Sequence, residues 1–168
     1  MTAEETKRNN EHIWASVFVS GINKIHGFDY SLVPERGENS PVDMYVVSQS
    51  GKLPQLELQL TYAVELPFMA YEQPAIANYT KQPTLDAINR KFEKLQHQGE
   101  DLGKLILVIQ GYMNHETAKV VFADESFTKY KAFPFKGIYY VAPSMMSAET
   151  EESLQEGYLI AIKDAFNS

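Results

Sequence analysis

Hydrophobic residues near the amino terminus recur every three or four positions. The stripe runs from Ile13 to Ile25, and Gly27 comes two positions later. This spacing places the apolar side chains on one face of a helix, and glycine favours a helix end. We therefore predict an amphipathic first helix that ends near Gly27.

After Gly27 the pattern changes to the alternation that is typical of strands. Apolar and polar residues alternate over residues 28–33, 42–48 and 56–62. Residues 49–51 separate the last two segments, and Gly51 suits a turn position that needs a positive φ. Pro54 indicates a bend or a sheet edge at the start of the third segment. We predict three strands, the last two joined by a three-residue hairpin turn.

The rest of the chain predicts two more helices and further strands. Thr84 can cap a second helix that ends at Gly99, and residues 105–109 form an apolar run typical of a strand covered on both faces. Residues 120–122 and 138–141 are shorter strand candidates, and residues 148–166 predict a last helix with acidic first turns. The proline-interrupted, aromatic-rich residues 63–82 show no assignable pattern.

The order of these elements predicts a mixed α/β fold, in which helices flank a central sheet. The chain has 168 residues, of which 44% are apolar and 22% are charged. This length and composition suit one globular domain, residues 1–168, with its own hydrophobic core.

The composition excludes several kinds of site. Cysteine is absent, which excludes disulfides, thiolate zinc sites and cysteine nucleophiles, and the four histidines are too scattered for a zinc-binding helix motif. The longest run without a charged residue, 137–148, is shorter than the roughly 18 residues of a membrane span. The charged first ten residues do not form a secretory signal. We expect a soluble, cytoplasmic protein with no membrane partner.

Two acidic residues in the predicted hairpin are the first candidates for chemistry. A three-residue turn pairs Ser48 with Lys52 and therefore places Asp43 directly opposite Glu57. Like charges facing each other across a ladder are destabilising unless a cation lies between them. Carboxylate oxygens suit Mg²⁺ or Mn²⁺, which can position a water and stabilise a phosphoryl group in transfer. The alternative is that each acid is solvated.

This part of the chain resembles the PD-(D/E)XK nuclease superfamily, which has the restriction-endonuclease-like fold. The residues that carry the resemblance are Pro41-Val42-Asp43, Glu57-Leu58-Gln59, the helix at 87–92 and the strand at 105–109. Element order extends it over most of residues 8–141. The resemblance implies an αβββαβ core, to which the predicted C-terminal helix is an addition, and hydrolysis of nucleic-acid phosphodiester bonds.

The resemblance also implies roles for particular residues. Asp43 and Glu57 would hold the metal, because the aspartate and the following acidic residue do so in that family. A glutamate on the first helix often joins them, and Glu11 is the candidate because it lies one turn before Trp14 on the apolar stripe. A surface role is the alternative for Glu11.

Gln59 departs from the family pattern, which usually has lysine at this position. A lysine supplies positive charge and can orient the attacking water, whereas a glutamine can only hydrogen-bond. Lys91 lies close in angle to Ile88 and Leu95 on the second helix and could supply that charge. The alternatives are that Gln59 is a sheet-surface amide, that Lys91 is a solvated lysine and that activity has been lost.

A second segment bears on nucleic-acid binding. The net charge of −7 argues against binding by the molecule as a whole, so a local basic region is needed. Residues 127–137 contain Lys129, Lys131 and Lys136 but no acidic residue, with Tyr130 and two phenylalanines between them. Lysines can neutralise phosphates while aromatic rings stack on bases. The alternative is an edge hairpin whose lysines discourage aggregation.

The sequence therefore leads to two hypotheses. The first is a nuclease that uses Mg²⁺ or Mn²⁺ and acts on nucleic acid, with DNA favoured over RNA, in which Asp43, Glu57, Gln59 and Lys91 carry the chemistry. The second keeps the fold without catalysis: an interaction or regulatory module, linked to a mobile element or a restriction system, whose partner surface includes residues 62–79. By analogy with the family, a homodimer is expected.

Overall fold

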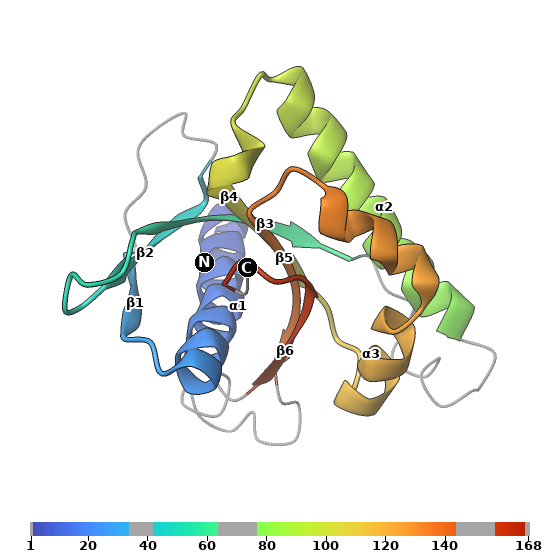
Figure 1. Ribbon diagram of the computed structural model, residues 1–168, viewed down its shortest axis with the longest axis horizontal. Helices are drawn as coiled ribbons and strands as arrows, with labels where there is room; N and C mark the ends of the chain where they lie inside the picture. The colour runs from blue at the N-terminus through green and yellow to red at the C-terminus, as the bar shows by residue number, and fades with distance from the viewer. Residues whose placement is uncertain (1, 34–41, 64–76, 144–156, 167–168) are drawn as a thin grey trace.

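A mixed sheet lies between helices in the computed structural model, which describes residues 2–33, 42–63, 77–143 and 157–166 (Figure 1). Helix α1 (Ala3–His26) covers one face, and α2 (Ala77–His97) and α3 (His115–Phe122) cover the other. The rings of Tyr139 and Tyr140 identify the faces, because neighbouring residues of a strand point to opposite sides. Tyr139 contacts Phe18 of α1, whereas Tyr140 contacts Phe122 of α3.

The six strands follow each other in the sheet in the order of the sequence. Their bounds are Tyr30–Val33 (β1), Met44–Ser48 (β2), Leu56–Tyr62 (β3), Leu105–Gln110 (β4), Gly137–Pro143 (β5) and Gly157–Lys163 (β6). The pairs β1–β2 and β2–β3 are antiparallel, the pairs β3–β4 and β4–β5 are parallel, and β6 is antiparallel to β5. The chain is thus an α/β protein, as the sequence predicts.

The parallel part of the sheet explains the positions of the later helices. Two parallel strands need a crossover connection, and α2 connects β3 to β4. Helix α3 and the 3₁₀ helix η4 (Glu125–Ala132) connect β4 to β5. Every residue of β4 is buried, which confirms the prediction of a strand covered on both faces.

Several element boundaries agree with the sequence pattern. The first helix ends at His26, and Gly27 adopts a φ of 69° directly after it. The second ends at His97, and Gly99 has a φ of 72°. Only glycine takes this left-handed conformation at little cost, so both glycines act as helix stops.

Three predicted elements are wrong. Residues 120–122 belong to α3 and not to a strand. The predicted C-terminal helix is the strand β6 over Gly157–Lys163, where the chain pairs with β5; residues 148–156 lie outside the described part. Helix α2 begins at Ala77, so Thr84 is a buried residue within the helix and not its cap.

The register of the β2–β3 hairpin differs from the predicted one by two residues. Val46 pairs with Leu56 and Tyr45 pairs with Glu57, so the prediction that Asp43 lies directly opposite Glu57 is wrong. In the predicted register Val46 would face Pro54, which has no N–H group to give to the ladder. The carbonyl of Pro54 instead accepts a hydrogen bond from the Tyr30 hydroxyl (2.8 Å).

The Asp29 carboxylate, which lies between α1 and β1, binds residues of this longer turn. The Ser48 hydroxyl donates to Asp29 Oδ1 (2.6 Å), and the backbone N–H of Ser50 donates to Asp29 Oδ2 (2.7 Å). Gly51 has a φ of 73°, which confirms its predicted turn role. Asp29 therefore helps to set the register that positions the residues of β2 and β3.

Asp29 provides a test of this turn. Its hydrogen bonds with Ser48 and Ser50 lower its pKa from 3.8 to about 2. A carboxyl group whose pKa is lower in the folded state stabilises the fold above its unfolded pKa, and this contribution is lost as the pH falls through the folded pKa. We predict that Asp29→Ala lowers the free energy of unfolding at neutral pH, and that its difference from wild type shrinks between about pH 4 and pH 2. Urea unfolding over that range measures this; a constant difference would contradict it.

Candidate active site

Asp43 lies just before β2 and binds the neighbouring strand β3 through both its backbone and its side chain. Its backbone N–H donates to the carbonyl of Leu58 (2.8 Å). Its carboxylate oxygen Oδ2 accepts from the backbone N–H of Leu60 (2.7 Å) and from Gln59 Nε2 (3.0 Å). These bonds hold the Asp43 carboxylate against β3, directly before the first residue of β2.

Gln59 is a buried polar residue with one unused oxygen. Its exposed fraction is 6%, so the alternative of a sheet-surface amide is wrong. Its Nε2 donates to Asp43, whereas Oε1 is buried and has no hydrogen-bond partner among the described residues. A buried acceptor without a donor costs free energy. A cation or a ligand donor beside Asp43 would remove this cost.

Glu57 shares a face of the sheet with Asp43 and Gln59. It lies two residues before Gln59 and pairs with Tyr45, which in turn lies two residues after Asp43. Since side chains alternate along a strand, the two acids project to the same side, offset by one pair. The predicted shared face holds, although the predicted direct pairing does not.

This face is the one that α2 covers. Gln59 pairs with Leu107 of β4, and Leu107 lies two residues before Ile109, which pairs with Tyr140. Tyr140 contacts α3, so this row of residues points toward α2 and α3. Helix α2 itself packs on β3 and β4. The candidate residues therefore project between the sheet and α2.

Lys91 lies on the side of α2 that packs on the sheet. It is partly buried and falls between the buried residues Ile88 and Leu95 at three and four positions, as the sequence predicts. The neighbouring Arg90 guanidinium donates to the carbonyl of Tyr62 (3.3 Å), which places this turn of α2 beside the end of β3. Lys91 is thus partly screened from solvent, and its role at the site stays a prediction.

Glu11 is buried, with an exposed fraction of 5%, so its predicted surface role is wrong. Burial raises the pKa of Tyr62, and the nearby Glu11 charge raises it further. Glu11 therefore lies near the carboxyl end of β3. Within the described parts of the chain, no group of three or more acidic, histidine or cysteine side chains is arranged to hold a metal ion.

The predicted basic segment forms the helix η4 and adjoining loop, not a strand or a hairpin. Tyr130 is fully buried, and its hydroxyl donates to Asn89 Oδ1 of α2 (3.0 Å). Phe127 and Phe135 are buried as well. These rings belong to the core, so the prediction that Tyr130 stacks on bases is wrong. Lys129 and Lys131 are exposed, and Lys136 is partly buried.

The structure shows two polar residues that the sequence reasoning missed, Arg90 beside the candidate site and Gln110 on the α1-facing side of the sheet. Gln110 ends β4, is buried, and has neither amide atom hydrogen-bonded within the described structure. In the sequence, Gln110 stands out as the polar residue directly after the apolar run 105–109. Arg90 had no distinct signal, because its contact is with the carbonyl of Tyr62, 28 residues away in the sequence.

Comparison of the chain with protein-family models, with curated proteins and with solved structures found no match. None of the helices in the described ranges has the length and hydropathy that crossing a membrane requires. Most of the proposed partner surface at residues 62–79 lies outside the described residues.

Replacing Gln59 by glutamate tests the pairing of Gln59 with Asp43. The substitution exchanges the amide donor for a second carboxylate beside the partly buried Asp43, and the two negative charges then repel each other. We predict that Gln59→Glu lowers the free energy of unfolding by about 1–3 kcal/mol at neutral pH. Because repulsion raises the pKa of the new carboxyl group, the loss should decrease as the pH falls toward about 4.

The matched control is Gln98→Glu, because Gln98 is exposed just after α2. Urea unfolding of both variants over the same pH range provides the comparison. Equal stability of Gln59→Glu and Gln98→Glu at neutral pH would contradict the pairing.

Proposed function

We propose that this protein is a metal-dependent nuclease that hydrolyses phosphodiester bonds of nucleic acid, with DNA as the favoured substrate. The observation that carries the proposal is the pair formed by Asp43 and Gln59, in which a fixed carboxylate accepts from the amide nitrogen, while the amide oxygen is buried without a hydrogen-bond partner among the described residues. The pair offers a metal ion a carboxylate oxygen of Asp43, directly before β2, and the amide oxygen of Gln59, in the middle of β3.

The order of elements supports the same proposal. From Ala3 to Gln110 the chain follows the order helix, three strands, helix and strand. The three strands form an antiparallel meander, and the fourth is parallel to the third. The αβββαβ order of the restriction-endonuclease-like fold, which the sequence resemblance implies, has the same succession. The α3 helix and the strands β5 and β6 would extend this core.

The residues present fit a hard divalent cation such as Mg²⁺ or Mn²⁺. These ions prefer carboxylate and amide oxygens, and they keep several waters. Asp43 and Glu57 would hold the ion, and Gln59 Oε1 would be a third protein ligand in place of Glu11. The orphaned buried oxygen of Gln59 is the observation that supports this fit. When bound, the ion would activate a water and stabilise charge on the phosphate.

The chain's own residues would orient the substrate and neutralise its charge. The N–H of Leu60 and the amide of Gln59 keep the Asp43 carboxylate in place. Lys91, on the sheet-facing side of α2, would donate to an oxygen of the scissile phosphate and stabilise negative charge that develops there. In this proposal Lys91 supplies the positive charge that Gln59 cannot.

A catalytically inactive interaction module remains the second candidate, because Gln59 stands where the family usually has lysine. The two functions differ in one observable. A nuclease cleaves DNA when Mg²⁺ or Mn²⁺ is added, whereas the module does not cleave under any metal condition.

Cleavage of labelled single-stranded and duplex DNA tests the proposal. We predict cleavage that requires Mg²⁺ or Mn²⁺ and is abolished by a chelator. Asp43→Asn should lower the rate by about a hundredfold or more, and Lys91→Met by about tenfold or more. The exposed acid Asp101 provides the matched control, since Asp101→Asn should leave the rate unchanged. No cleavage by wild type with either metal would reject the nuclease and favour the module.

A further inference from the structure

We infer that the nucleic-acid backbone lies along a basic row on α2, formed by Arg90, Lys94 and His97, and not on the lysines of η4. The inference rests on the proposed function and assigns it a substrate-binding surface. The three residues follow each other at four and three positions, so they line one side of the helix. They span about 10 Å along the axis, comparable to the axial rise of three nucleotide steps in a B-form strand at about 3.4 Å each.

The row lies on the flank of α2 that borders the candidate site. Arg90 donates to the carbonyl of Tyr62 on β3, and Lys91 beside it faces the sheet. The opposite flank packs on η4, where Phe92 contacts Phe133 and Asn89 accepts from Tyr130. A strand bound along the row would therefore pass next to β3, which carries Gln59.

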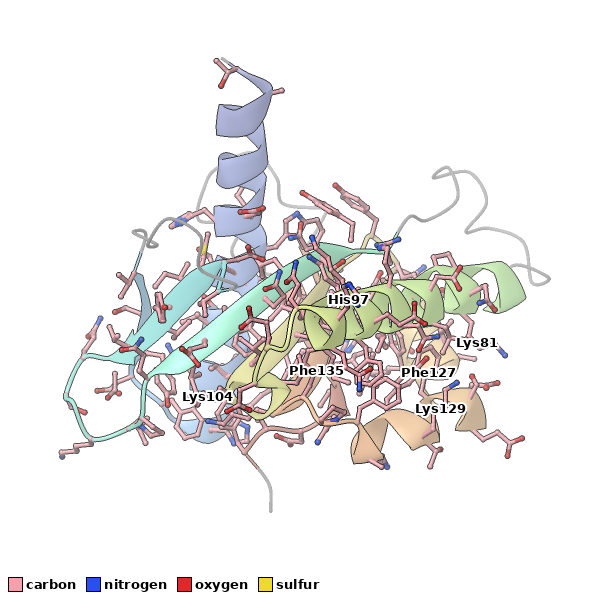
Figure 2. All side chains as sticks on the ribbon, turned by 90° about the horizontal axis from the view of Figure 1, so that it is seen from above. Lys81, His97, Lys104, Phe127, Lys129 and Phe135 are labelled. Carbon is pink, nitrogen blue, oxygen red and sulfur yellow. The ribbon has the colours of Figure 1, made fainter. Side chains whose placement is uncertain are left out.

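The lysines of η4 lie on the side of α2 that faces away from β3 and the candidate site. In Figure 2, α2 lies between Lys129 and β3. The contacts of Tyr130 and Phe133 with α2 agree with this view. Phosphates held by Lys129 and Lys131 would thus be separated from Asp43 by the helix.

Arg90 keeps donors for a phosphate beyond the one that binds the Tyr62 carbonyl. A guanidinium group has five N–H donors, and the Tyr62 carbonyl uses one of its NH2 groups. Since Arg90 is exposed, its remaining donors can reach a phosphate from solvent. The planar arrangement of these donors matches two phosphate oxygens at once.

The row lines a shallow depression, and its cationic side chains have no ion pair with another described residue. Arg90, Glu93, Lys94, Gln96 and His97 line an open depression of about 730 Å³ on α2. In the described parts of the chain, the ion pairs involve other lysines, namely Lys81, Lys104 and Lys119. Glu93 is the one acid in the lining. The depression therefore keeps a positive side-chain charge despite the net charge of −7.

DNA binding in the presence of a chelator tests the inference separately from catalysis. The probe is fluorescein-labelled DNA of about 20 nucleotides, single-stranded and duplex, measured by fluorescence anisotropy as the salt concentration is varied. We predict that Arg90→Ala with Lys94→Ala weakens binding about tenfold or more near 100 mM salt, and lowers the salt slope by about two. The matched control, Lys129→Ala with Lys131→Ala, should change the affinity less than about twofold.

A variant with a single charge reversal provides a second test in case the double variant does not fold. Lys94 is exposed, so Lys94→Glu should keep the wild-type melting temperature and still weaken binding. An unchanged affinity in both α2 variants, or an equal loss in the η4 control, would overturn the inference, as would absent binding by wild type. Binding that depends on α2 without any cleavage would overturn the proposed nuclease function and leave this surface in place.

Discussion

The candidate site depends on one carboxylate that is bound to the neighbouring strand. Asp43 Oδ2 accepts from the backbone of Leu60 and from the side chain of Gln59. Because the acceptor is charged, these hydrogen bonds are stronger than those between neutral groups. They hold the start of β2 against the middle of β3 and orient the Gln59 amide, whose oxygen is buried without a hydrogen-bond partner among the described residues. The proposed chemistry follows from this arrangement.

Periodicity predicted the elements that bury a regular apolar face. The first helix, the strands β3 and β4, and the glycine stops Gly27 and Gly99 appear where their patterns indicate. The face shared by Asp43 and Glu57 was predictable too, because alternation decides it. The sequence did not indicate the hairpin register, since that depends on contacts of the turn with Asp29, between α1 and β1, and with Tyr30 of β1.

The remaining errors have a common cause, which is burial by distant parts of the chain. The aromatic residues of η4 resemble a base-stacking surface until the packing of α2 shows that they belong to the core. The C-terminal segment resembles a helix by its acidic residues, but pairing with β5 makes it a strand. Glu11 is buried for the same reason, near Tyr62 at the end of β3. Local propensity cannot report such contacts.

The central claim is that Asp43 and Gln59 form one half of a hard-cation site. A crystal structure of the protein soaked in Mn²⁺, with anomalous diffraction recorded, tests it most directly. The account predicts an anomalous peak within about 2.5 Å of an Asp43 carboxylate oxygen and of Gln59 Oε1. A crystal in which Mn²⁺ binds only elsewhere, while Gln59 Oε1 accepts a hydrogen bond from a protein donor, would contradict it.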